Sequence, residues 1–210
     1  MPAAVCMVPN PNLKFEKGIW PTYPFVAGLD EAGRGALAGP VCVGAVILPN
    51  GDPQLSSTLS GVRDSKLLTS LKRDVLAPCI KATVLTWSVA FASAEEIDEL
   101  GIVPATRLAA MRAIELLTQF PDYLLTDFRL EVPELDIPQT AIVKGDQKSL
   151  SIAAASILAK TARDELMREL ESQYPNYGLG GHKGYGTQAH RHALKRIGFS
   201  SIHRKTFKVK

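Results

Sequence analysis

Four acidic residues stand beside apolar segments, where an unpaired negative charge is unfavourable. Asp30 and Glu31 are adjacent and follow an apolar entry, Asp127 follows the apolar residues 123–125, and Asp164 lies in a long Ala-rich segment. Neighbouring carboxylates repel each other, which raises one of their pKa values unless a cation neutralises them. Mg²⁺ and Mn²⁺ prefer such oxygen ligands. These ions promote phosphodiester hydrolysis by activating water and stabilising the leaving oxygen, so the four acids predict a site for one or two divalent ions.

Each of these acids also has an ordinary structural explanation. Asp30 and Glu31 could form a solvated acidic turn, because acids are common on surfaces. Asp127 could cap a turn or a helix. Asp164 follows Lys160 by four residues, which is the spacing of an ion pair on one helix face. Only their occurrence together, each at the edge of an apolar element, favours the metal site.

The predicted elements explain how the acids could meet. Consecutive side chains on a strand point to opposite faces, so Asp30 and Glu31 can reach a common point only where their strand ends. Strands pair first and then alternate with helices, which predicts an α/β fold with a mixed central β-sheet flanked by helices. Hydrophobic periodicity and turn residues predict strands over 25–29, 41–48, 83–92, 123–126 and 140–143, and helices over 69–82, 94–100, 104–119, 149–173 and 187–197.

One domain is expected over residues 23–210, after a poorly ordered lead-in over residues 1–22 that is rich in proline and asparagine. The three cysteines, Cys6, Cys42 and Cys79, form no CxxC motif and indicate a reducing compartment. The longest apolar stretch is too short to span a membrane, and the N-terminus lacks the pattern of a secretory signal. The sequence therefore predicts a cytoplasmic protein that does not bind membranes.

The C-terminal segment, residues 172–210, is strongly basic. It holds eight of the 24 lysines and arginines, all four histidines and no acid, which leaves 16 basic against 21 acidic residues in the rest of the chain. Aromatic side chains interleave with these charges, so the segment can pack and stack as well as remain solvated. A surface for a polyanion is favoured over a solvated basic face.

Six segments form a recognisable set of motifs. They are GLDEAGRGALAGPV (28–41), DSKLLT (64–69), DYLLTDF (122–128), KGDQKSLSIAAASILAKTARD (144–164), YPNYGLGGHKGYGTQAHRHAL (174–194) and GFSSIHRKTF (198–207). They resemble the ribonuclease HII family, the type 2 ribonucleases H, and the resemblance covers residues 26–207. The motifs DEAGRG and SIAAASILAK at this separation are highly specific for the family. The resemblance implies an RNase H-like fold with a C-terminal helical extension, about residues 172–210, that binds substrate.

The resemblance also implies roles for the matching residues. Asp30, Glu31 and Asp127 would bind Mg²⁺ or Mn²⁺, and Asp164 would be the fourth acid of the site. One departure from the family pattern is Phe128, which follows the third acid where a small residue is usual.

Implied substrate contacts lie in the glycine-rich segments and on several lysines. Gly33, Arg34 and Gly35 would approach the 2′-hydroxyl of a ribonucleotide, and Tyr185 would stack on the sugar of the next nucleotide. Reading the 2′-hydroxyl distinguishes RNA from DNA, and glycine permits the close backbone approach that this needs. The implied phosphate contacts are Lys66, Lys144, Lys148, Ser149 and Lys183.

The activity implied by the resemblance is cleavage of the RNA strand of RNA–DNA hybrids. It extends to incision 5′ to single ribonucleotides embedded in duplex DNA, leaving 5′-phosphate and 3′-hydroxyl ends, by a protein acting as a monomer. Two alternative functions make different demands on the sequence. Ribonuclease HIII, a sister enzyme, would need an additional N-terminal substrate-binding domain. A non-catalytic nucleic-acid-binding module would not need four acids. The C-terminus shows no evident sliding-clamp motif, which leaves a replication partner open.

Overall fold

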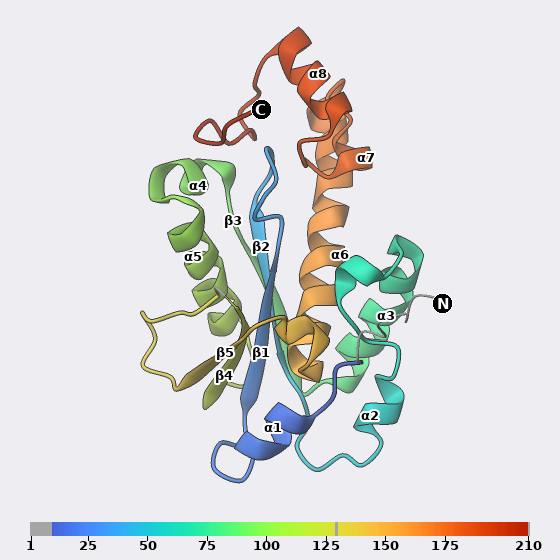
Figure 1. Cartoon of the computed structure of the whole chain (residues 1–210), viewed down its shortest axis with the longest axis vertical. Helices are drawn as coiled ribbons and strands as arrows, with labels where there is room; N and C mark the ends of the chain where they lie inside the picture. Colours follow the sequence, from blue (N-terminus) through green and yellow to red (C-terminus); the bar gives the residue numbers. More distant parts are fainter. Residues whose placement is uncertain (1–9, 129, 210) are drawn as a thin grey trace, which may run out of the picture.

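A five-stranded mixed sheet forms the centre of the molecule (Figure 1). The computed structural model describes residues 10–128 and 130–209. The strand order is β3-β2-β1-β4-β5. β2 pairs antiparallel with both β1 and β3, whereas β4 pairs parallel with both β1 and β5. The strands are β1 (Val26–Ala32), β2 (Val41–Ile47), β3 (Thr86–Ala92), β4 (Tyr123–Asp127) and β5 (Gln139–Ile142). This confirms the mixed sheet and all five predicted strands.

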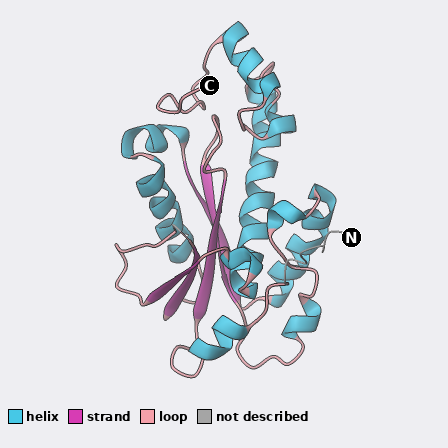
Figure 2. Cartoon of the chain, in the orientation of Figure 1, coloured by secondary structure: helices cyan, strands magenta, loops and turns pink. Residues whose placement is uncertain are grey.

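Helices cover both faces of this sheet (Figure 2). The long helix α6 packs against β1 and β2 on one face, and α5 packs against β2 and β3 on the other. The longer helices are α3 (Ser70–Thr83), α4 (Ala94–Leu100), α5 (Ile102–Glu115), α6 (Leu150–Gln173) and α8 (Gln188–Ile197), as predicted with small shifts of their ends. Short elements that were not predicted are α1 (Lys14–Ile19), α2 (Leu55–Thr58), α7 (Leu179–His182) and the 3₁₀ turns η1 (Ser65–Leu67) and η2 (Gly145–Gln147).

Close packing of α6 on the sheet is a consequence of small residues on both sides. A Cβ atom at Gly28 of β1 would overlap the backbone of Ser151, and one at Gly44 of β2 would lie 2.5 Å from the carbonyl oxygen of Ala155. Alanines on α6 complete this contact and are fully buried. The helix therefore lies close enough to β1 for its polar residues to reach the side chain of Asp30.

The C-terminal extension packs at one end of α6 and then returns to the sheet (Figure 1). Its small core includes Met167 of α6, Leu179 of α7, Leu194 of α8, and Tyr177, which precedes α7. An isolated bridge joins His203 of the returning tail to Ala38, which follows β1. The extension therefore contacts the loop that follows the paired acids. No helix in the described part of the chain has both the length and the apolarity to cross a membrane.

The N-terminal segment differs from the expected lead-in. Residues 1–9 lie outside the described part, but α1 packs on the core through Leu13 and Trp20, which are buried. Glu16 is also fully buried and accepts hydrogen bonds from the hydroxyl groups of Ser149 (2.6 Å) and Ser151 (2.8 Å) and from the Ser151 amide (2.9 Å). An acid at the N-terminus of a helix complements its free amides and its dipole. Glu16 thus anchors α1 to α6.

Replacing Glu16 with alanine is expected to lower the free energy of unfolding by about 2–3 kcal/mol, because buried hydroxyl and amide groups lose their acceptor. The matched variant Lys17→Ala removes an exposed side chain of the same helix and should change stability by less than about 0.5 kcal/mol. Chemical denaturation of both variants measures the difference. Equal stability of the two would show that α1 does not support α6.

Candidate metal centre and substrate-binding loops

The three parallel strands bring acids to one edge of the sheet. Leu29 of β1 pairs with Thr126 of β4, so the next residues, Asp30 and Asp127, are neighbours. Asp127 in turn pairs with Ile142, the last residue of β5. The carboxyl ends of parallel strands form the usual site of ligand binding in α/β sheets. The parallel pairing of β1 and β4 therefore explains why Asp30 and Asp127 lie next to each other.

Asp30 and Glu31 lie inside β1 rather than after its end. The strand continues to Ala32 because it pairs with β2 there, whereas β4 stops at Asp127. The two acids are therefore at a strand end only on the β4 side of the sheet. This corrects the predicted end of the strand at residue 29 and keeps both acids at the same edge.

Asp30 is an acid in an unfavourable environment. It is 2% exposed, and its Oδ2 atom has no hydrogen-bond partner among the described residues. Burial raises its pKa well above the usual value, and the charges of Glu31, Asp127 and Asp146 raise it further, against a hydrogen bond from Ser156. A carboxylate held in this way favours either a proton or a cation.

Glu31 and Asp127 complete the side of the cluster that comes from the strands. Burial raises the pKa of Glu31, while Arg34, whose Nη1 lies 3.8 Å from Oε1 of Glu31, lowers it. Within residues 10–128 and 130–209, the Oε2 atom of Glu31 has no hydrogen-bond partner. Asp127 is half-buried and accepts a 2.6 Å hydrogen bond from the amide of Gly145. That bond ties the end of β4 to the turn after β5.

Asp146 joins this cluster, although it was not among the predicted site residues. It lies in η2, separated from the end of β5 by three residues, and is 4% exposed. Burial raises its pKa to about 7, together with the charges of Asp64 and Asp127, against the opposing effect of Lys66. Asp146 also contributes to the raised pKa of Asp30. Like Asp127, it comes near the end of a strand, and this was the signal in the sequence that could have identified it.

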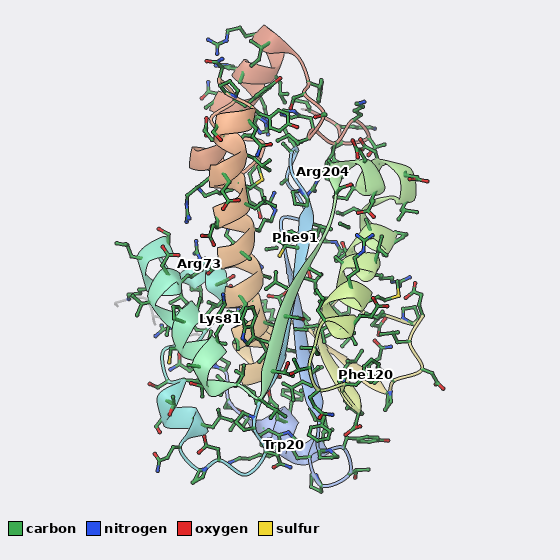
Figure 3. The ribbon with its side chains drawn as sticks, turned by 180° about the vertical axis from the view of Figure 1, so that it is seen from behind. Trp20, Arg73, Lys81, Phe91, Phe120 and Arg204 are labelled. Atoms are coloured by element: carbon green, nitrogen blue, oxygen red, sulfur yellow. The ribbon has the colours of Figure 1, made fainter. Side chains whose placement is uncertain are left out.

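Asp164 is placed differently from the prediction. Its Oδ1 atom lies 2.6 Å from Nζ of Lys160 and its Oδ2 atom 3.0 Å from Nη2 of Arg73. The ordinary alternative, an ion pair with Lys160, is therefore present. Arg73, which is labelled in Figure 3, also donates to the carbonyl oxygens of Ser65 and Leu68. Both oxygens of Asp164 are thus occupied by cations, and it braces the 65–68 segment rather than joining the carboxylate cluster.

Lys66 lies beside the acids. Burial by itself would lower the pKa of its ammonium group, but the charges of Asp30, Asp146, Asp64 and Glu31 outweigh this and raise the pKa. Asp64 holds the segment by accepting a 2.9 Å hydrogen bond from the Lys66 amide. The side chain of Lys66 is exposed, so it can meet a phosphate at the edge of the cluster.

The acids fit a divalent ion bound by oxygen ligands. The donors are carboxylates, and Asp30 and Glu31 each present a buried oxygen that has no partner in the described part of the chain. Within the described ranges, no three His, Cys, Asp or Glu side chains are arranged so that they could hold one ion as they stand. The site is therefore an open cluster of carboxylates rather than a preformed metal cage.

The metal-free protein is expected to lose stability as the pH rises. The raised pKa values of Asp30 and Asp146 mean that the folded state binds protons that the unfolded state releases. The free energy of unfolding therefore falls between about pH 4, the ordinary carboxyl value, and about pH 7, the pKa of Asp146, by up to about 1.4 kcal/mol per pH unit for each acid. Because Mg²⁺ replaces these protons, it should raise the melting temperature more at pH 8 than at pH 5. An equal effect of Mg²⁺ at both values, measured by thermal unfolding, would contradict this assignment.

The GRG loop, residues 33–40, follows β1 directly. Gly33 has a φ of 87°, and a Cβ atom there would overlap the side chain of Arg163. Gly35 is exposed, and a Cβ atom there would meet no atom within 4 Å. Protein packing therefore requires glycine at position 33, while position 35 leaves room for a ligand to approach the backbone.

Tyr185 lies next to this loop. The carbonyl oxygen of Gly184 accepts a 2.8 Å hydrogen bond from the Leu37 amide, which joins the two segments. The half-buried ring of Tyr185 lies 5.4 Å from both Nζ of Lys160 and Cζ of Arg163. The structure thus brings the predicted 2′-hydroxyl reader and the predicted stacking residue together.

The model for the ribonuclease HII family matches residues 27–210. The chain belongs to the ribonuclease HII family. It is 49% identical to a ribonuclease HII of Dehalococcoides mccartyi over 99% of this chain and 95% of the relative, and 46% identical to one of Clostridioides difficile over 93% and 73%. Its fold resembles that of the ribonuclease H2 from Pyrococcus horikoshii, with a TM-score of 0.73, 27% identity, and 88% of this chain and 94% of that one covered. The match confirms the predicted family and makes the protein an endoribonuclease.

More distant structures share the fold. A ribonuclease HII from Archaeoglobus fulgidus, solved in complex with PCNA, has a TM-score of 0.68 at 25% identity and covers 86% of this chain and 92% of that one. Bst-RNase HIII in complex with Mn²⁺ has a TM-score of 0.65 at 18% identity, with 88% of this chain and 67% of that one covered. The RNase H-like fold predicted from the motifs is therefore confirmed.

The predicted phosphate contacts of this ribonuclease HII family member divide into two groups. Lys66, Lys144 and Lys148 are exposed, and Lys183 is half-buried. Ser149 is fully buried, caps α6 and donates to Glu16, so it cannot reach a phosphate in this structure. Its role is corrected to that of a helix cap. Phe128, the departure from the family pattern, is 50% exposed beside Asp127.

Proposed function

We propose that this endoribonuclease hydrolyses the RNA strand of RNA–DNA hybrids and also cuts duplex DNA on the 5′ side of a single embedded ribonucleotide. The products would carry 5′-phosphate and 3′-hydroxyl ends, and the reaction would depend on Mg²⁺ or Mn²⁺. The observation that supports this most strongly is the cluster of carboxylates at the carboxyl edge of three parallel strands, in a chain of the ribonuclease HII family.

The residues that would hold the ion are Asp30, Glu31, Asp127 and Asp146. Asp146 takes the place proposed for Asp164, because it shares the electrostatic environment of Asp30 and Asp127 while Asp164 is neutralised by two cations. A bound divalent ion would supply activated water and charge stabilisation at the leaving oxygen. The burial of Asp30 keeps competing water away from its unpaired oxygen.

The GRG loop and Tyr185 would select the nucleotide. Gly35 leaves its backbone open to a close partner such as the 2′-hydroxyl. Tyr185 offers a flat face to a deoxyribose, against which an added hydroxyl group would be desolvated. The two elements adjoin through the hydrogen bond between Leu37 and Gly184, which suits recognition of an RNA–DNA junction.

The basic extension would hold the duplex through its phosphates. Arg191, Lys195 and Arg196 of α8 are exposed on one short helix, and such contacts bind independently of sequence and weaken with salt. We propose that the protein acts as a monomer.

Three matched duplexes test the proposal: an RNA–DNA hybrid, a DNA duplex with one ribonucleotide, and the same duplex made only of DNA. Cleavage should occur in the first two, require Mg²⁺ or Mn²⁺, and leave the all-DNA duplex intact. End mapping of the one-ribonucleotide products should place the cut 5′ to the ribonucleotide. Binding of the duplexes without metal-dependent cleavage would instead support a non-catalytic binding module.

A further inference from the structure

Arg204, in the C-terminal tail, donates hydrogen bonds to the backbone of the GRG loop. Its Nε atom donates to the carbonyl oxygen of Gly39 (3.0 Å), its Nη1 to that of Arg34 (2.9 Å) and its Nη2 to that of Gly33 (2.8 Å). The side chain is fully buried, where the tail returns to the end of the sheet (Figure 3). One planar guanidinium group thus fixes both ends of the loop.

Arg163 of α6 also binds the backbone of this loop. It donates to the carbonyl oxygens of Pro40 (2.9 Å) and Ala38 (3.1 Å) and, across a gap in the sequence, to that of Lys183 (3.0 Å). It is also fully buried. Because Lys183 precedes Tyr185 by two residues, Arg163 connects the GRG loop to the segment that carries the proposed stacking residue.

Arg163 and Arg204 are buried arginines whose hydrogen bonds go to carbonyl oxygens. Each also lies over an aromatic ring, with Cζ of Arg163 5.4 Å from the ring of Tyr185 and Cζ of Arg204 5.1 Å from the ring of Phe207. In the described part of the chain, neither Arg163 nor Arg204 belongs to an ion pair. A buried cation without a carboxylate partner is unfavourable for stability and is retained only where its hydrogen bonds are needed. Here the guanidinium forks define the path of the backbone at the positions proposed to read ribose.

The tail that supplies Arg204 is itself tied to the far face of the sheet. Asp98 of α4 accepts hydrogen bonds from the Lys205 amide (2.8 Å), the Thr206 amide (3.0 Å) and the Thr206 hydroxyl group (2.6 Å). The Arg204 amide donates to the Leu37 carbonyl oxygen (2.9 Å), inside the GRG loop. A continuous path therefore runs from α4 through the tail to the loop.

We propose that Arg204 is a positioning residue for the discrimination of ribose from deoxyribose, and that Asp98 acts through it. Arg204 holds the carbonyl groups of the GRG loop so that the loop backbone faces the 2′-hydroxyl at a fixed distance from Tyr185. This inference rests on the proposed function, because it assumes that the GRG loop reads the 2′-hydroxyl.

A binding ratio provides the test. Affinity is measured in Ca²⁺, in place of Mg²⁺, for two duplexes that differ only in one 2′-hydroxyl, and the affinity for the ribonucleotide duplex is divided by that for the all-DNA duplex. The Arg204→Ala variant should lower this ratio about tenfold, the scale of one lost hydrogen bond. Its affinity for the all-DNA duplex, which depends on phosphate contacts, should stay within about twofold. Free guanidinium ion, at concentrations far below those that unfold the protein, should restore the ratio.

Matched controls separate positioning from general destabilisation. Arg107→Ala also removes an arginine that donates to a carbonyl oxygen, that of Glu131, and should leave the ratio unchanged. Asp98→Ala should lower the ratio about threefold, because in free energy its effect should be about half of that of losing one hydrogen bond. Asp52→Ala removes a comparable acid-to-amide contact, to Gln54, and should have no effect.

An unchanged ratio in a folded Arg204→Ala variant would overturn the proposal, as would an equal loss of both affinities. If Arg204→Ala does not fold, Asp98→Ala decides: an unchanged ratio overturns the proposal and a reduced ratio supports it. Failure of the proposed function is seen separately, because the wild-type protein itself would then show a ratio near one and no cleavage of either ribonucleotide-containing duplex.

Discussion

Asp146→Asn is expected to reduce Mg²⁺-dependent cleavage of an RNA–DNA hybrid about 10³-fold, whereas Asp164→Asn should reduce it less than about tenfold. Removing a charged metal ligand forfeits several kcal/mol of charge stabilisation, and about 4 kcal/mol corresponds to a 10³-fold change in rate. Asp164 instead pairs with Lys160 and Arg73, so its loss weakens the brace on the 65–68 segment. Measurements of kcat/KM for both variants, at saturating and limiting Mg²⁺, provide the comparison.

The stability of the same two variants should change in the opposite order. Asp164→Asn breaks a buried pair and leaves Arg73 without its acid, which should lower the free energy of unfolding by about 2–4 kcal/mol. Asp146→Asn relieves repulsion with Asp64 and Asp127 and should not destabilise the metal-free protein. If Asp164→Asn abolished cleavage at unchanged stability, Asp164 would be restored as the fourth acid and Asp146 would lose that role.

Asp30→Asn is expected to abolish activity by at least about 10³-fold while raising the melting temperature of the metal-free protein by about 3–10 °C. The activity falls because the metal loses the negatively charged carboxylate of Asp30, with its buried, unpaired oxygen, as a ligand. The stability rises because a buried carboxylate repelled by Glu31 and Asp127 becomes neutral. Differential scanning calorimetry with and without Mg²⁺ measures the second effect, and the variant should show little stabilisation by Mg²⁺.

A useful control for Asp30→Asn is Asp122→Asn, which changes an acid near the opposite end of β4 whose carboxylate accepts from the amide of Phe25. It should keep both cleavage and the response to Mg²⁺. If Asp30→Asn were less stable than the wild-type protein without metal, the carboxylate would be contributing to stability through contacts other than those described, and the opposition between function and stability at this position would be wrong.

The strand-edge acids could be predicted because they follow apolar runs. Asp30, Glu31 and Asp127 each follow such a run, and parallel pairing brings their positions together. Asp146 also follows a strand, β5, but three residues separate it from the strand end, so it does not stand at the end of an apolar run as the other acids do. Its proximity to Asp30 depends on the fold of η2, which a periodicity argument does not describe.

The placement of Asp164 differs from the prediction for another reason. Its spacing from Lys160 correctly predicts a shared helix face, but the spacing does not say what that face meets. The deciding neighbour, Arg73, comes from α3, 91 residues earlier in the chain. Glu16 illustrates the same limit, since its burial is determined by residues at the start of α6.

The arginine contacts to the GRG loop were also beyond local sequence reasoning. Arg204 appeared as one of many charges in a basic segment, where solvent exposure or phosphate binding is the usual expectation. Its burial follows from the return of the tail to Ala38 and from the anchoring of residues 205 and 206 by Asp98. Such a long-range closure is visible only once the chain has folded.

The position of a bound Mn²⁺ ion would show which carboxylates form the metal centre. Crystals of the wild-type protein grown with Mn²⁺ and measured at a wavelength where manganese scatters anomalously would locate the ion independently of activity. We predict anomalous density among the carboxylates of Asp30, Glu31, Asp127 and Asp146, and none beside Asp164. Density at Asp164 with none at Asp30, or no density at a Mn²⁺ concentration that supports cleavage, would contradict the account.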